Sequence, residues 1–82
     1  MDEVGKVTHY YGHIGVAIVA LSGALKVGDK IKVEGNRTEF EQTVDSMEVD
    51  RAPVSAAKKG DVVGVKVREK VNEGATVWKL EG

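Results

Sequence analysis

A glycine-centred turn that recurs along the chain is the feature that most constrains its fold. Gly23 to Ile31 reads Gly-Ala-Leu-Lys-Val-Gly-Asp-Lys-Ile and lies between two apolar runs. Gly28 can adopt the positive φ that a type II turn requires at its third position, and Asp29 can hydrogen-bond to backbone just after it. The pattern Gly-Asp-x-apolar returns at Gly60, and at Gly74 alanine replaces the aspartate. Turns of this kind, each leading into an apolar segment, predict a β-protein.

The segments between these turns have the composition and the alternation of short strands. Valine and isoleucine dominate the apolar residues, and no window of helical length shows a period of 3.6 residues. The spacing breaks near Asp45-Ser46, which predicts a bulge or a sharp bend, and Val54 to Lys59 is expected to be a loop with a short helical turn. We predict one all-β domain over residues 1–82, a small closed barrel of six or seven strands. The expected strands cover residues 4–10, 14–21, 30–34, 38–50, 63–67 and 76–80.

One of these segments, Ile14 to Leu21, is apolar at nearly every position. Such a run suits either a strand covered on both faces or a strand whose outer face meets a partner. It is far too short to span a bilayer. The start of the chain also lacks the basic and apolar regions of a signal peptide, so we expect a cytoplasmic protein with no membrane partner.

The charge of the chain limits the kind of partner it can bind. The formal net charge is −1 over 82 residues, whereas a free-standing nucleic-acid-binding domain usually carries a basic excess. Any contact with RNA would therefore have to come from a local basic patch. The simpler interpretation is a mixed-sign surface that keeps the protein soluble.

Several motifs occur in an order that is fairly specific for one fold. They are Val4-Gly5-Lys6-Val7, Ile14 to Val19, the Gly23 to Ile31 tract, Val44-x-Ser46-Met47 and Ala57-x-x-Gly60-Asp61-Val62-Val63-Gly64-Val65. Together they resemble the β-barrel second domain of translation GTPases of the elongation factor Tu type. A closer resemblance is to stand-alone translation elongation factor-like proteins and to the C-terminal barrel of collagenase-like peptidases. There the segments His9-Tyr10-Tyr11 and Thr38 to Gln42 are also similar.

The resemblance implies a translation-related role with tRNA or ribosomal RNA as partner, or an accessory role beside a separate peptidase. The chain contains no Gly-x-x-x-x-Gly-Lys-[Ser/Thr] loop, so we expect no GTP or other nucleotide to bind and no cofactor to be required. GTP-driven delivery is excluded for this chain alone.

His9, Tyr10, Tyr11 and His13 form the densest group of residues with binding chemistry. Tyrosine rings can stack on unpaired bases. The alternative is that one tyrosine fills the barrel while the other rings cover a hairpin end. Zinc binding is disfavoured because the two histidines sit near a strand end with no cysteine in the chain.

Lys66 and Arg68 alternate on one strand and could present a basic stripe to phosphates, with Lys58 and Lys59 nearby. The alternative is a solvated strand face guarded by lysine. No carboxylate is paired with a nucleophile and no serine lies in a Gly-x-Ser-x-Gly context, so we predict no catalytic residue and no enzyme activity.

The leading hypothesis is therefore a non-enzymatic binding module that contacts RNA through His9, Tyr10, Tyr11, His13, Lys66 and Arg68. The alternative hypothesis is a protein-interaction or accessory module for a separate enzyme such as a peptidase.

Overall fold

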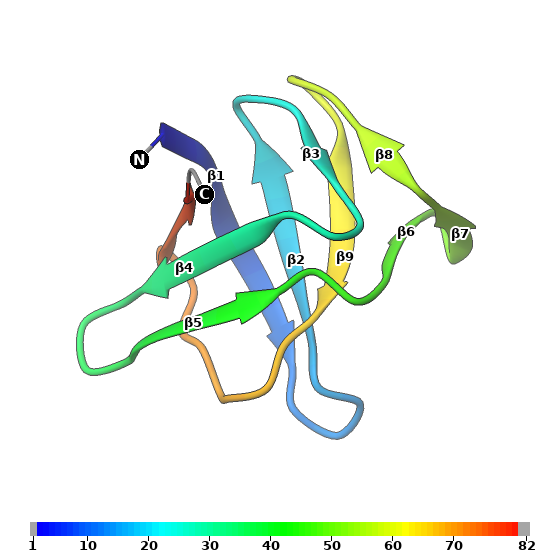
Figure 1. The fold of residues 1–82 in the computed structure, drawn as a ribbon. Helices are drawn as coiled ribbons and strands as arrows, with labels where there is room; N and C mark the ends of the chain where they lie inside the picture. The colour runs from blue at the N-terminus through cyan, green and yellow to red at the C-terminus, as the bar shows by residue number, and fades with distance from the viewer. Residues whose placement is uncertain (1, 81–82) are drawn as a thin grey trace.

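The computed structural model describes residues 2–80, which are all-β (Figure 1). Residues 2–80 contain no helix that is long and apolar enough to cross a membrane. The strands are β1 (Asp2–Tyr11), β2 (Val16–Leu21), β3 (Leu25–Lys26), β4 (Lys30–Glu34), β5 (Glu39–Thr43), β6 (Met47–Val49), β7 (Ala52–Val54), β8 (Ala56–Ala57), β9 (Val62–Lys66) and β10 (Thr76–Lys79).

Eight of these strands form one antiparallel sheet in the order β5-β4-β10-β1-β2-β9-β6-β7, and β3 pairs with β8 separately. The sheet curls, so that Figure 1 shows the β4–β5 hairpin in front of β1 and β2. Buried side chains from both parts, including Val33, Phe40, Val19 and Val63, form one hydrophobic core inside the curl. Inward and outward positions alternate along β2, β4 and β5.

Three glycine turns lead into strands as the repeated motif predicts. Gly28, Gly60 and Gly74 have φ values of 97°, 95° and 91°. In the first two turns the aspartate after the glycine accepts a hydrogen bond from a backbone N–H three residues earlier, and both bonds measure 3.0 Å. The third turn keeps the backbone bond, from the Ala75 N–H to the Asn72 carbonyl at 3.2 Å, without the side-chain bond.

The first strand, β1, has two irregularities in its pairing with its neighbours in the sheet. Its pairing register shifts between Glu3 and Gly5 against β10, and again between Val7 and His9 against β2. Gly5 is buried, and a Cβ at this position would lie 2.5 Å from Cγ1 of Val19. Glycine is required there because the sheet folds tightly over the core at that point.

The sheet is an open half-barrel of eight strands, which differs from the closed barrel of six or seven strands that the sequence predicts. The strands at its two ends, β5 and β7, are not paired with each other. Instead of a strand ladder, side-chain hydrogen bonds join β5 to the end of β9 and to the residues just beyond it. Gln42 on β5 donates to the Lys66 carbonyl and accepts from the Arg68 N–H, both at 2.8 Å. A guanidinium nitrogen of Arg68 also donates to the Glu41 carbonyl at 2.8 Å, which covers part of the free edge of β5.

The segment between residues 43 and 62 confirms one expectation and corrects another. The strand predicted over residues 38–50 is two strands, β5 and β6, which pair with β4 and β9. The chain leaves strand conformation at residues 44–46, so the interruption predicted near Asp45-Ser46 is confirmed. The prediction of a loop with a short helical turn from Val54 to Lys59 is wrong, because Ala56–Ala57 forms strand β8 and pairs with β3. The pairing partner is about thirty residues away, so no local pattern indicates it.

Candidate interaction site on the outer face of the sheet

The outer face of β2 carries apolar side chains that the core does not use. Ala17, Val19 and Leu21 point into the core, whereas Val16 and Ile18 lie on the opposite face and are only half-buried. Of the two interpretations of the Ile14 to Leu21 run, the structure thus fits a strand with a partly open outer face. This strand lies in the middle of the sheet, between β1 and β9.

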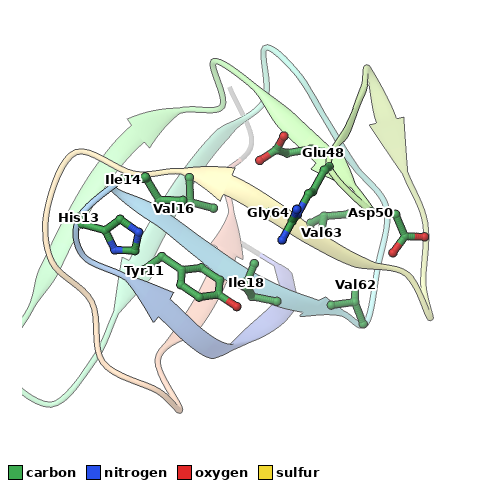
Figure 2. Close-up of a pocket in the computed structure, with 11 residues that line it drawn as sticks. Tyr11, His13, Ile14, Val16, Ile18, Glu48, Asp50, Val62, Val63 and Gly64 are labelled. Atoms are coloured by element: carbon green, nitrogen blue, oxygen red, sulfur yellow. The ribbon is translucent and has the colours of Figure 1, made fainter.

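A groove of about 460 Å³ runs across this face (Figure 2). Its apolar members include three of the four large hydrophobic side chains that are most exposed: Val62 at 54%, Ile14 at 48% and Tyr11 at 41%. Its lining is Tyr11, His13, Ile14, Val16, Ile18, Glu48, Asp50, Arg51, Val62, Val63 and Gly64. Figure 2 shows that these residues come from the β1–β2 hairpin, from β9 and from the neighbourhood of β6.

A glycine in the middle of β9 shapes the floor of the groove. Gly64 pairs with Ile18 on one side and with Glu48 on the other, so it occupies an outward position. A Cβ there would lie 3.2 Å from Cγ1 of Val16 and 3.6 Å from Cγ of Glu48. Gly64 is itself buried, because the side chains of Val16, Ile18 and Glu48 fill the space over it and so form the surface of the groove there.

The β6–β7 hairpin turn lies at one end of the groove and has an unusual backbone. Its two central residues, Asp50 and Arg51, have φ values of 51° and 66° and are the non-glycine residues with positive φ among those described. A two-residue turn of this geometry favours Asn-Gly or Asp-Gly, because glycine adopts positive φ without steric cost. Arginine at the second position costs about 1 kcal/mol and keeps a long cationic side chain beside the groove.

The charged residues of the groove are not used in ion pairs within the part of the chain that the structure describes. The ion pairs there join His9 to Glu73, Lys32 to Glu39 and Lys79 to Asp29. Glu48, Asp50 and Arg51 thus lie beside the apolar side chains of the groove and form no ion pair within residues 2–80. The rim of a protein interface has this character.

The structure brings the predicted rings together in part. The His9 and Tyr11 rings are 4.5 Å apart and those of Tyr11 and His13 are 6.4 Å apart, both edge to face. Nδ1 of His9 lies 3.2 Å from a carboxylate oxygen of Glu73. Tyr10 points to the other face and packs against the core. The ring row is therefore His9, Tyr11 and His13, and its last two members line the groove.

Lys66 and Arg68 are separated by the contacts they make. Lys66 pairs with Val16, which places it on the outer face beside the groove, and its Nζ donates to the Ile14 carbonyl at 3.0 Å. Arg68 lies beyond the end of β9 and its guanidinium contacts β5. The stripe expected from these two side chains is thus divided between two parts of the surface. Residues 2–80 contain no group of three or more His, Cys, Asp or Glu side chains arranged to hold a metal ion.

Sequence reasoning missed the part of the groove contributed by Val62, Glu48, Asp50 and Arg51. The exposure of Val62 could be predicted from the sequence. Val63, Val65 and Val67 alternate toward the core, so Val62 must point to the opposite face. The hairpin residues carried no such signal, since the sequence pattern Asp-Arg-Ala-Pro does not indicate a two-residue turn with two positive φ values.

Fold and groove together define a small all-β domain built as an open half-barrel. The chain belongs to the Elongation factor Tu domain 2 family, whose model matches residues 16–77. The match confirms the resemblance to this family that the ordered motifs indicate.

Curated relatives of the chain are proteases. It is 40% identical over 80 residues to an uncharacterized protease of Methanocaldococcus jannaschii, a match that covers 96% of this chain and 20% of the relative. It is 31% identical over 80 residues to a collagenase of Porphyromonas gingivalis, a match that covers 95% of this chain and 22% of the relative. The chain thus spans about a fifth of the length of these proteins.

Solved structures show the same fold. The C-terminal domain of a Geobacillus thermoleovorans protein assigned as a U32 peptidase superposes with a TM-score of 0.91 at 20% identity, covering 98% of this chain and 93% of that domain. The selenomethionine variant of that domain also gives a TM-score of 0.91, at 21% identity, and is covered completely.

Proposed function

We propose that this chain is a non-catalytic accessory module that acts together with the catalytic region of a peptidase of the U32 type. The observation that carries the proposal is the identity of 31–40% over 80 residues to segments of proteases that are about five times longer. A segment shared at this level by full-length proteases is expected to serve the activity of those proteases.

The surface of the domain supports a binding role over a catalytic one. The groove combines apolar side chains with a few charged groups, and the structure gives no nucleophile beside a general base within it. Its volume of about 460 Å³ lies on an open sheet face. Such a surface suits a macromolecular partner.

The hypothesis of RNA binding rests on a separate observation, the exposed row of His9, Tyr11 and His13 beside Lys66. Aromatic rows of this type stack on unpaired bases. The relatives named as proteases favour the accessory role, so RNA binding is the second candidate.

A domain exchange tests the accessory role. The P. gingivalis collagenase is prepared in three full-length or near-full-length forms: unchanged, with its matched 80 residues deleted, and with those residues replaced by this chain. We expect the deletion to lower collagen cleavage and the replacement to restore most of it. Circular dichroism and size-exclusion chromatography establish that each form is folded.

A folded replacement protein that is no more active than the deletion form would refute the accessory role.

The RNA hypothesis is tested separately by a mobility-shift titration of the isolated chain with tRNA and ribosomal RNA at low and moderate salt. Salt-sensitive binding at micromolar protein would support RNA contact.

A further inference from the structure

We propose that the groove between the β1–β2 hairpin, β9 and the β6–β7 turn is the surface by which this domain docks on the peptidase catalytic region. The inference rests on the proposed accessory function and names the surface that carries it. The expected occupant is a protein protrusion with an apolar side chain against Val16 and Ile18 and a lysine or arginine facing Glu48 and Asp50.

Apolar exposure at this place exceeds what the fold requires. Val62, Ile14 and Tyr11 are 54%, 48% and 41% exposed, and all three lie in one groove together with half-buried Val16 and Ile18. Single exposed hydrophobic residues are ordinary, whereas a contiguous group with charged neighbours marks an interaction surface.

Two local features reduce the stability of the isolated domain, and the residues of both features line this groove. Gly64 forgoes a packed side chain in the centre of the sheet, and Asp50-Arg51 holds a left-handed turn with no glycine. Strained or weak positions of this kind collect at functional sites. Their coincidence at one groove points to a ligand that packs on the Val16 and Ile18 side chains lying over Gly64 and contacts the turn.

The charges of the groove favour a protein partner over nucleic acid. Two carboxylates, Glu48 and Asp50, line it beside a single arginine, Arg51. Carboxylates repel phosphates, and the nearby ammonium of Lys66 is already bound to the Ile14 carbonyl at 3.0 Å. A protein surface can present opposite charges to both the carboxylates and Arg51, which sets orientation as well as affinity.

The partner is identified by what surrounds this domain in its relatives. The matched segment makes up 20–22% of those proteases, so four-fifths of each protein is available to contact it. A domain held in the same chain needs only a weak docking surface, because the linkage raises the effective concentration. A groove of modest size with charged margins meets that requirement.

The test measures whether the groove is covered in the replacement collagenase. The chain has no cysteine, so Ile14→Cys serves as a reporter in the groove and Val27→Cys as a matched reporter outside it. Val27 is also an exposed aliphatic residue, at 39%, and does not line the groove. Maleimide labelling of each site is followed by peptide mass spectrometry in the isolated chain and in the replacement protein.

We expect Ile14→Cys to be labelled about tenfold more slowly in the replacement protein than in the isolated chain, with Val27→Cys labelled at equal rates in both. Adding Val62→Glu to the replacement protein restores fast labelling of Ile14→Cys, because it places a carboxylate in the apolar floor. Adding Val27→Glu, a matched change on exposed surface, leaves the protection in place.

The outcomes separate this inference from the proposed function. An active replacement protein in which Ile14→Cys is labelled as fast as in the isolated chain overturns the docking surface and leaves the accessory role standing. A folded but inactive replacement protein overturns the accessory role. Protection of Ile14→Cys in the isolated chain, either by added RNA or with rising protein concentration, overturns the inference in favour of RNA or of a second copy of this chain.

Discussion

Gln42 offers the sharpest test of how the open side of the half-barrel is held. Its side chain is 7% exposed and joins β5 to the chain beyond β9. Nε2 donates to the Lys66 carbonyl, and Oε1 accepts from the Arg68 N–H, both at 2.8 Å. We expect Gln42→Leu, which keeps much of the side-chain volume but has no polar atoms, to destabilise the domain strongly.

The magnitude follows from the two backbone groups left behind. A lost hydrogen bond costs about 1 kcal/mol net, and a buried donor or acceptor left unpaired costs about 1–3 kcal/mol. The removed amide recovers part of this sum because Gln42 no longer has to be desolvated. Lys66 and Arg68 are exposed residues, so water reaches part of the two backbone groups left unpaired. We therefore expect a loss of about 2 kcal/mol, a sizeable share of the roughly 4–12 kcal/mol typical of a domain of this size.

The assay is equilibrium unfolding in urea, followed by the fluorescence of Trp78, the single tryptophan of the chain. The midpoint should fall at constant slope, since the surface exposed on unfolding is unchanged. Glu41→Leu on the exposed face of the same strand is the matched control and should change stability by less than about 0.5 kcal/mol. A Gln42→Leu midpoint equal to that of the control would refute the argument that these side-chain bonds hold β5 against the end of β9.

Three further changes test other parts of the fold. Gly5→Ala should cost about 2–3 kcal/mol, because the added methyl meets the neighbouring strand at 2.5 Å; urea unfolding measures it. Asp29→Ala should cost more than Asp61→Ala, because both lose a 3.0 Å bond to backbone but Asp29 also lies 3.4 Å from the Lys79 ammonium; thermal unfolding of both variants measures the difference. Arg51→Gly should stabilise the domain by about 1 kcal/mol, because it relieves a left-handed arginine; urea unfolding measures the gain, and labelling of the groove reporter measures the accompanying loss of docking.

Each of these has a control within the chain. Gly12→Ala should be nearly neutral, since its nearest contact would be 3.4 Å, and equal losses at Gly5 and Gly12 would contradict the packing argument. Equal effects of the two aspartate variants would show that the Lys79 pair contributes nothing measurable. An Arg51→Gly protein that is no more stable than the parent would contradict the assignment of strain to the turn.

The glycine turns show why much of the fold is readable from the sequence. A positive φ near 95° restricts a position to glycine, so Gly28, Gly60 and Gly74 mark their turns directly. The strand from Lys30 to Glu34 is predicted with its observed bounds, because it starts just after such a turn and alternates cleanly.

The curl of the half-barrel and the groove both depend on contacts between segments that are distant in the sequence. Gln42 holds β5 against the end of β9 by reaching residues 24 and 26 positions away, and no local pattern encodes such a bond. The sequence predicts the row of rings because His9, Tyr11 and His13 lie close together along the chain. The other side of the groove comes from residues 48–64, which the pairing of β6 with β9 and of β9 with β2 brings next to those rings.

The position of β10 has a consequence for how the domain assembles. This strand lies between β1 and β4, with Lys79 opposite Asp2 on one side and opposite Ile31 on the other. During synthesis, β1 and β4 therefore leave the ribosome well before β10, the strand that joins them in the sheet. Until β10 emerges, the β4–β5 hairpin has no strand through which to pair with β1. Because such long-range pairing pays loop-closure entropy before it gains contacts, the nascent domain should fold late and in one step, after Thr76–Lys79 has emerged.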